Sequence, residues 1–173
     1  MSQNERADRV AIVTGASRGI GSAIADARVE RGARVVLSSR KQADLDAEAE
    51  RINAVHRDAA VAIAAHTGRP EDLERLVDET RSAFGKVDIL VNNAGITRDS
   101  QLVRVKGGQL TGQLSESDFD AVVNVNLKGV FNCAQAVAPP MLTQGFGRIL
   151  NAFSLVVLTV DFGRTTYVAT KEV

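Results

Sequence analysis

A tyrosine and a lysine stand one helical turn apart near the end of the chain, in the stretch Tyr167-Val168-Ala169-Thr170-Lys171. Positions i and i+4 share one face of an α-helix, so the ammonium group of Lys171 would lie beside the phenol of Tyr167. A nearby positive charge lowers the pKa of a tyrosine from its usual value of about 10, which makes the phenol a better acid near neutral pH. The pair therefore predicts proton transfer to or from a substrate oxygen. The same spacing, taken alone, also fits an ordinary helix with a solvated lysine.

A glycine-rich turn near the start of the chain indicates a phosphate-binding site. The apolar run Val10–Val13 leads into the residues TGASRGIG, an order typical of strand, turn and helix. Gly15 can adopt a turn conformation, Gly19 lets backbone amides approach a phosphate, and Gly21 lets the following helix pack closely on the strand. The helix expected from Ile20 to Arg31 would point its positive end at a pyrophosphate. A turn that needs glycines but binds nothing is the alternative; we favour dinucleotide binding.

Further elements must position these groups, and they alternate along the chain as strand and helix. The predicted strands are Val10–Val13, Arg34–Ser38, Val61–Ala64, Ile89–Asn92 and Arg148–Asn151. The predicted helices are Ile20–Arg31, Ala43–His56, Pro70–Phe84 and Ser115–Leu142, the last bent or interrupted by Pro139-Pro140. Continuous apolar strands separated by helices predict an α/β fold, a doubly wound parallel sheet covered on both faces. Residues 1–173 are interpreted as a single domain.

The composition excludes several classes of protein. With 173 residues, 45% of them hydrophobic and 24% charged, the chain is long enough for one domain with its own core. A formal net charge of zero argues against nucleic acid or a membrane surface as the main partner. The polar segment Met1–Arg9 is no signal peptide, and no apolar run reaches transmembrane length, so we expect a cytoplasmic protein. Cys133 is the one cysteine and is expected to pack within a helix. No cluster with metal-ligand spacing is present, so no metal is expected.

Several motifs together resemble the short-chain dehydrogenase/reductase family. These are TGASRGIG, then Asn92-Asn93-Ala94-Gly95, Asn126, Ser154 and YVATK, in an order and spacing that cover nearly the whole chain. ITRD after NNAG, and NVNLKGVFN further on, resemble the 3-oxoacyl-carrier-protein reductases within that family. The resemblance implies a Rossmann-like sheet of strand order 3-2-1-4-5 and hydride transfer between a nicotinamide and a carbonyl or secondary alcohol. A 3-oxoacyl thioester is the expected substrate, and a sugar, steroid or small ketone is the alternative.

The resemblance also implies roles for individual residues. Tyr167 would donate a proton to the substrate carbonyl, Ser154 would hydrogen-bond the same oxygen, and Lys171 would lower the pKa of Tyr167 and hold the nicotinamide ribose. Asn126 would kink its helix and anchor a water that relays protons to Lys171. The residues expected to bind the cofactor are Gly15, Ser17, Arg18, Gly19, Ile20, Gly21, Ser39, Arg40, His66, Asn92, Ala94, Gly95, Tyr167 and Lys171.

The end of the second strand predicts NADP(H) rather than NAD. Members of the family that use NAD place an Asp there, whereas this chain has Ser39 followed by Arg40 and Lys41. A guanidinium at Arg40, with Arg18 reaching from the glycine turn, suits a 2′-phosphate. The alternative is that Arg40 and Lys41 are solvated charges at a helix start.

The chain departs from the family pattern in three places. His66 replaces an Asp that meets the adenine amino group, which puts adenine recognition in doubt, although an imidazole nitrogen could accept from that amine. Phe153 stands beside Ser154, and Val157 and Val160 stand where the family usually has glycines. These changes are interpreted as harmless loop variation, as a longer fifth strand, or as an aggregation hazard. The extension Ser100–Gln113 contains glycine turn signals and predicts a small hairpin.

Relatives in the family continue beyond the YxxxK motif, so the sequence is interpreted as incomplete at its C-terminus. The alternative function is therefore a catalytically inactive, nucleotide-binding remnant. In the full-length form the helix Ser115–Leu142 is expected to contribute to a homo-oligomer, a dimer or tetramer, through the apolar residues Val122, Val130, Phe131 and Val137. An acyl carrier protein is a possible partner, although little basic charge surrounds Arg148 to dock one.

Overall fold

A five-stranded parallel sheet forms the centre of the protein. The computed structural model describes residues 8–154 and 163–171. The strands are β1 (Val10–Thr14), β2 (Arg34–Ser39), β3 (Ala60–Ala64), β4 (Ile89–Asn92) and β7 (Arg148–Asn151). They lie in the order β3-β2-β1-β4-β7, each parallel to its neighbours. Because β7 is the fifth strand of this sheet along the chain, the predicted order 3-2-1-4-5 is confirmed.

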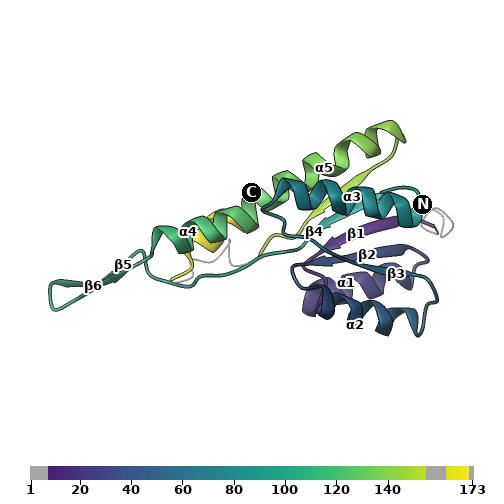
Figure 1. The fold of residues 1–173 in the computed structure, drawn as a ribbon. Helices are drawn as coiled ribbons and strands as arrows, with labels where there is room; N and C mark the ends of the chain where they lie inside the picture. Colours follow the sequence, from purple (N-terminus) through teal and green to yellow (C-terminus); the bar gives the residue numbers. More distant parts are fainter. Residues whose placement is uncertain (1–7, 155–162, 172–173) are drawn as a thin grey trace.

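Helices cover both faces of the sheet, which makes three layers (Figure 1). One face is covered by α1 (Gly19–Val29) and α2 (Gln42–Asn53), and the other by α3 (Pro70–Phe84) and α5 (Gly129–Thr143). Side chains alternate along a strand, so neighbouring residues of β1 enter different cores. Val13 packs toward α1 and α2, whereas Ile12 packs toward α3 and α5. The continuous apolar strands predicted from the sequence therefore serve two cores at once.

The predicted helix Ser115–Leu142 consists of three parts. They are α4 (Glu116–Val123), the π-helical turn η2 (Asn124–Lys128) and α5, and the hydroxyl of Ser115 caps α4 by accepting from the Asp118 amide at 3.1 Å. Pro139-Pro140 was predicted to bend or interrupt this helix, and the interruption is wrong, because α5 continues to Thr143. The prolines lie close to the end of α5, so few helical hydrogen bonds are lost, and Val137 and Met141 hold this part in the core. The irregularity instead lies at η2, around Asn126.

The extension after β4 forms the predicted hairpin. Its strands are β5 (Val103–Lys106) and β6 (Gln109–Gln113), joined by Gly107 and Gly108, both with positive φ. Figure 1 shows the hairpin projecting away from the sheet beyond α4. Every residue of β5 is exposed, so the hairpin contributes nothing to the two cores.

The apolar residues expected at an oligomer face have different surroundings. Val122 and Val137 are buried within the chain itself, which contradicts the expectation that they lack cover. Phe131, on α5, is 61% exposed, so no part of the described chain buries it. None of the helices in the described ranges is long and apolar enough to cross a membrane.

Candidate functional site

A cavity of about 470 Å³ lies where strands β1, β2 and β3 end. In a doubly wound sheet this edge is where ligands bind, because the loops that leave the strands diverge there to opposite faces. The cavity is bounded by the glycine turn, the end of β2, the segment after β3 and the NNAG segment after β4. Its lining residues are Gly15, Ser17, Arg18, Gly19, Ser38, Ser39, Arg40, Lys41, Asp44, Ala65, His66, Thr67, Asn93, Ala94, Gly95, Ile96 and Val125.

The glycine turn has the shape that a phosphate group requires. Arg18 precedes α1 in extended conformation and makes no side-chain cap, so the first amides of α1 remain available at the cavity. Gly19 has φ of +62°, and a Cβ built on it would meet nothing within 4 Å, so the space above it is open to a ligand. Gly21 has a different role: a Cβ there would come within 2.3 Å of the Gly15 carbonyl oxygen, so this glycine permits α1 to pack on the turn. The residues present therefore fit a dinucleotide pyrophosphate.

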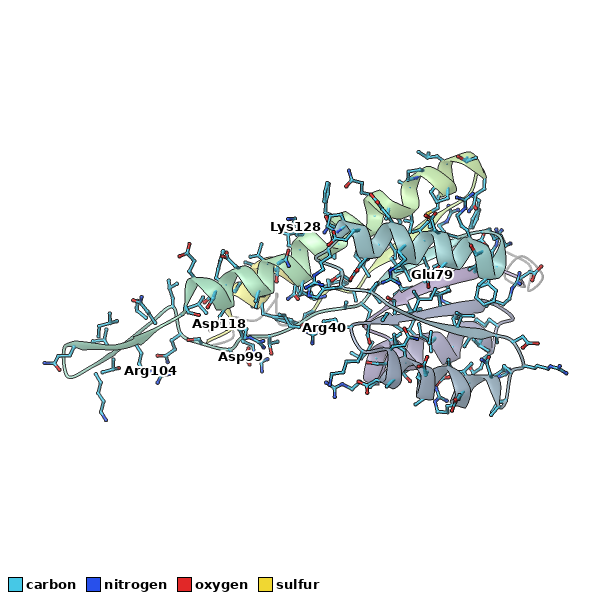
Figure 2. The ribbon with its side chains drawn as sticks, viewed as in Figure 1. Arg40, Glu79, Asp99, Arg104, Asp118 and Lys128 are labelled. Carbon is cyan, nitrogen blue, oxygen red and sulfur yellow. The ribbon has the colours of Figure 1, made fainter. Side chains whose placement is uncertain are left out.

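Basic side chains surround the end of β2 at the cavity. Arg40 and Lys41 line it together with Ser39, and Arg18 joins them from the glycine turn. Figure 2 labels Arg40 at this edge of the sheet. Asp44, which the sequence analysis did not single out, lines the same wall from the first turn of α2. The wall therefore carries three cationic groups and one carboxylate, an arrangement suited to a phosphate.

Thr14 and Asn93 hold the NNAG segment against the glycine turn, and neither was predicted as a site residue. The hydroxyl of Thr14 accepts hydrogen bonds from the amides of Asn93 and Ala94, both at 3.1 Å. The Asn93 side chain donates to the carbonyl of Thr14 at 2.9 Å. A polar residue ending an apolar strand was the available signal for Thr14. Together these bonds join the ends of β1 and β4 at the cavity.

Asn92 faces the sheet rather than the cavity. Its side chain donates to Asn151 across β4 and β7 at 3.0 Å and is buried. Of the other residues predicted to bind the cofactor, Ile20 is 73% exposed. Among the described residues, five of those predicted do not line the cavity: Ile20, Gly21, Asn92, Tyr167 and Lys171.

Asn126 joins three separate parts of the chain. Its side chain accepts from the Ile96 amide at 2.8 Å and donates to the Ile96 carbonyl at 3.0 Å. It also donates to the hydroxyl of Thr170 at 3.2 Å, and Thr170 in turn donates to the carbonyl of Tyr167. Asn126 is 1% exposed, so each of these polar groups is satisfied inside the protein. The π-helical turn is thereby tied to the NNAG segment and to α6 (Thr165–Lys171). Thr170 lies inside the YVATK motif but was not singled out.

Lys171 reaches the end of the NNAG segment. Its Nζ donates to the carbonyl of Ala152 at 3.1 Å, and a Cβ at Gly95 would come within 3.3 Å of its Cε. The absence of a side chain at Gly95 therefore leaves room for this lysine to pass closely. Lys171 is 7% exposed, and burial lowers its pKa from the usual 10.5, because removing water penalises the ammonium form.

Tyr167 and Ser154 complete the set of predicted catalytic residues. Tyr167 is half-buried on α6, one turn before Lys171, and α6 packs against α4 and η2. Ser154 is half-buried three residues beyond the end of β7, next to Phe153, which is 71% exposed. The structure thus bonds Asn126 to Thr170 on α6, and it brings the side chains of Lys171 and Asn126 together beside Gly95, with Tyr167 on the same helix as Lys171.

Two features of the sequence analysis remain to be placed. The run that contains Val157 and Val160 lies outside the described residues. Within residues 8–154 and 163–171, no three His, Cys, Asp or Glu side chains gather closely enough to hold a metal ion. Cys133 is buried in the core beside α3, and burial raises the pKa of its thiol to about 12, so it packs as predicted.

Comparison with known proteins yields one family and a consistent set of relatives. Residues 9–173 match the family model described as short chain dehydrogenase. The chain is 42% identical over 165 residues to the 3-oxoacyl-[acyl-carrier-protein] reductase FabG of Staphylococcus epidermidis, covering 95% of this chain and 64% of the relative. It is 43% identical to FabG of Staphylococcus aureus, covering 93% and 62%, and 37% identical to FabG of Thermotoga maritima, covering 94% and 62%. The chain therefore spans somewhat less than two thirds of the length of these relatives.

Proposed function

Because the chain belongs to the short-chain dehydrogenase family, we propose that it is the nucleotide-binding and catalytic part of an NADP(H)-dependent oxidoreductase. The reaction is hydride transfer between the nicotinamide and a carbonyl or secondary alcohol. The observation that carries the proposal is the buried cluster beside Gly95, which lines the cavity: Asn126 is bonded to Thr170 of α6, and Lys171 of α6 is bonded to the Ala152 carbonyl. A polar group so fully buried and connected, next to a phosphate-binding turn, suits catalysis better than stability alone.

The bound nicotinamide would supply or accept the hydride. Its phosphates suit the amides at the start of α1, where no side chain competes for them. The basic wall of Arg18, Arg40 and Lys41 supports the choice of NADP(H), because a 2′-phosphate needs charged donors and a ribose hydroxyl does not.

The side chains of this chain would then handle the proton. Tyr167 donates it to the substrate oxygen during carbonyl reduction, and Ser154 hydrogen-bonds that oxygen as negative charge develops. Lys171, held by its bond to the Ala152 carbonyl, stands one turn from Tyr167 and supports loss of the phenolic proton. Asn126 keeps the π-helical turn, the NNAG segment and α6 in register.

A 3-oxoacyl thioester is the proposed substrate. The relatives that support it are named 3-oxoacyl-[acyl-carrier-protein] reductases, and they extend across most of this chain at 37–43% identity. An acyl carrier protein is accordingly the proposed partner that presents the thioester.

The test is NADPH oxidation with an acetoacetyl thioester, measured together with nucleotide binding by fluorescence. We expect Tyr167→Phe to reduce turnover by about 10² to 10⁴ while NADPH still binds. Ser154→Ala should also reduce turnover, because it removes the hydroxyl proposed to bond the substrate oxygen. Ser117→Ala, on the exposed side of α4, is its matched control and should leave turnover unchanged. Binding without turnover would restrict the function to nucleotide binding, and no binding of NADPH would contradict the proposal.

Arg40 offers a separate test of the cofactor. Arg40→Asp should lower the preference for NADPH over NADH by about 10- to 100-fold, because a charged hydrogen bond contributes about 1.5–3 kcal/mol. Arg57→Asp is the matched control, since Arg57 is exposed before the start of β3, at the end of the sheet away from the cavity. The ratio of dissociation constants for the two nucleotides is the measurement. An unchanged ratio in Arg40→Asp would mean that Arg40 is a solvated charge.

A further inference from the structure

The segment after β3 is the wall of the cavity that a purine base would meet. With phosphates at the start of α1 and a ribose at the end of β2, the rest of the nucleotide extends toward the next strand outward. That strand is β3, at the edge of the sheet order. The residues that follow it and line the cavity are Ala65, His66 and Thr67. Among the described lining residues, His66 has the one aromatic ring.

A hydrogen bond determines which nitrogen of His66 carries the proton. The amide of Gly68 donates to Nδ1 of His66 at 3.0 Å, so Nδ1 is the acceptor. In a neutral imidazole one nitrogen accepts and the other donates, so Nε2 carries the hydrogen. Within the described residues Nε2 makes no hydrogen bond to the protein. The possibility that the imidazole accepts a bond from the adenine amine is therefore excluded for the neutral ring.

The surrounding turn holds His66 in this arrangement. Its amide donates to the carboxylate of Asp72 at 2.8 Å, and its carbonyl accepts from Arg69 at 2.9 Å. Gly68 packs directly on η2, because a Cβ there would come within 2.3 Å of the Asn124 side chain. The turn thus has little room to release Gly68, and the donor character of Nε2 follows from the fold.

We propose that His66 binds the purine by donating a hydrogen bond from Nε2 to an acceptor on its edge, so that the site accepts a 6-oxo purine at least as well as adenine. This inference rests on the proposed function as a nucleotide-binding enzyme. Adenine offers N1 and N7 as acceptors but presents an amine at C6, which a donor cannot satisfy. Hypoxanthine has an acceptor oxygen at C6 and carries a hydrogen on N1, so its acceptors on this edge are O6 and N7. The site therefore discriminates little against a 6-oxo purine, whereas a carboxylate that faces the C6 substituent would accept from the 6-amino group and repel the 6-oxo group.

The experiment compares dissociation constants for NADPH and for its analogue with hypoxanthine in place of adenine. The protein should bind the analogue as tightly as NADPH or more tightly. His66→Asp should prefer NADPH by about tenfold or more, because a carboxylate accepts from the amine and repels the 6-oxo group. An aspartate can accept from an amide two residues later, so it can keep the bond from Gly68 and the turn. His66→Ala should weaken both nucleotides and leave their ratio near one.

His56→Ala is the matched control, because His56, the other of the two histidines, is exposed before the start of β3, at the end of the sheet away from the cavity. It should leave both constants unchanged. The inference would be overturned if the unsubstituted protein preferred NADPH as strongly as His66→Asp does. A proton on Nδ1 of His66 in ¹⁵N spectra of the nucleotide-bound protein would also overturn it. Failure to bind either nucleotide would instead overturn the proposed function, and this inference with it.

Discussion

At the scale of single residues, burial decides what a polar side chain can do. Lys171 is enclosed by Gly95 and Ala152, and this enclosure lowers its pKa by desolvation. Arg40 also carries a positive charge, but its side chain is exposed at the cavity, where it can bind a phosphate. Lys171 is buried and Arg40 is exposed to solvent, so the proposed roles of the two cations differ: Lys171 acts on the proton of Tyr167, and Arg40 binds a phosphate.

The lowered pKa of Lys171 predicts a pH dependence of stability. Between its folded pKa and the unfolded value of 10.5, the unfolded chain binds more protons than the folded one. The free energy of unfolding therefore rises with pH in this window, by at most about 1.4 kcal/mol per pH unit, and levels off above it. Lys171→Met should remove this rise, as measured by chemical denaturation at a series of pH values.

Lys128→Met is the matched control, because Lys128 is exposed on η2, as labelled in Figure 2. It should keep the pH dependence of the unsubstituted protein. The same rise in the unsubstituted protein and in Lys171→Met would show that another group causes it.

At the scale of elements, α2 protects the edge of the sheet. β3 is an edge strand, and its outward backbone groups would otherwise be open to pairing with another chain. Asn53 donates to the carbonyl of Ala60 and accepts from its amide, both at 2.9 Å. Gln42 likewise donates to the carbonyl of Ala62 and accepts from the amide of Ala64. Two amide side chains thus take the place of a neighbouring strand.

This protection can be tested one amide at a time. Asn53→Ala should accelerate hydrogen exchange at the Ala60 amide and lower the free energy of unfolding by about 1–3 kcal/mol, because a buried donor and acceptor lose their partners. Gln42→Ala should accelerate exchange at the Ala64 amide instead. Each variant is the control for the other. Equal acceleration of both amides in either variant would indicate general loosening of β3.

At the scale of the whole molecule, the two ends of the sheet have separate tasks. The cavity lies where the strands end, whereas an ion cluster lies at the beginning of β1 and β4. There Asp88 pairs with Arg9 at 3.0 Å and Lys86 at 3.2 Å and accepts from the Val10 amide at 2.9 Å. Arg9 also stacks on the ring of Phe146, 3.8 Å from its centroid. This cluster stabilises the sheet far from the cavity.

Asp88→Ala should therefore lower stability without changing nucleotide binding. The carboxylate is nearly buried, so its loss removes two ion pairs and the acceptor of the Val10 amide, and should cost about 2–4 kcal/mol. Glu79→Ala removes an exposed pair with Arg75, labelled in Figure 2, and should change the free energy of unfolding by no more than about 0.5 kcal/mol. Thermal denaturation and NADPH titration are the measurements. A weaker NADPH affinity in Asp88→Ala would show that the two ends are coupled.

The sequence by itself determined the alternation of strands and helices, the glycine turn and the YVATK pair, whereas the strand order and the positions of Asn126 and Ser154 came from the family resemblance. Apolar runs, glycines and the YVATK spacing are local patterns, and local patterns follow from backbone and side-chain preferences. The boundaries of Pro70–Phe84 and Ile89–Asn92 were predicted correctly for this reason. Local preference did not predict the π-helical turn at Asn124–Lys128.

Only the tertiary structure decided which side chains meet. Asn126 bonds Thr170 across 44 residues and Ile96 across 30, and such pairs depend on how helices pack rather than on any local preference. Packing also places Gly68 so that its amide selects the tautomer of His66, a replacement that the sequence could only mark as unusual. The residue types were therefore readable from the chain, but their protonation and partners were set by contacts that only the folded chain creates.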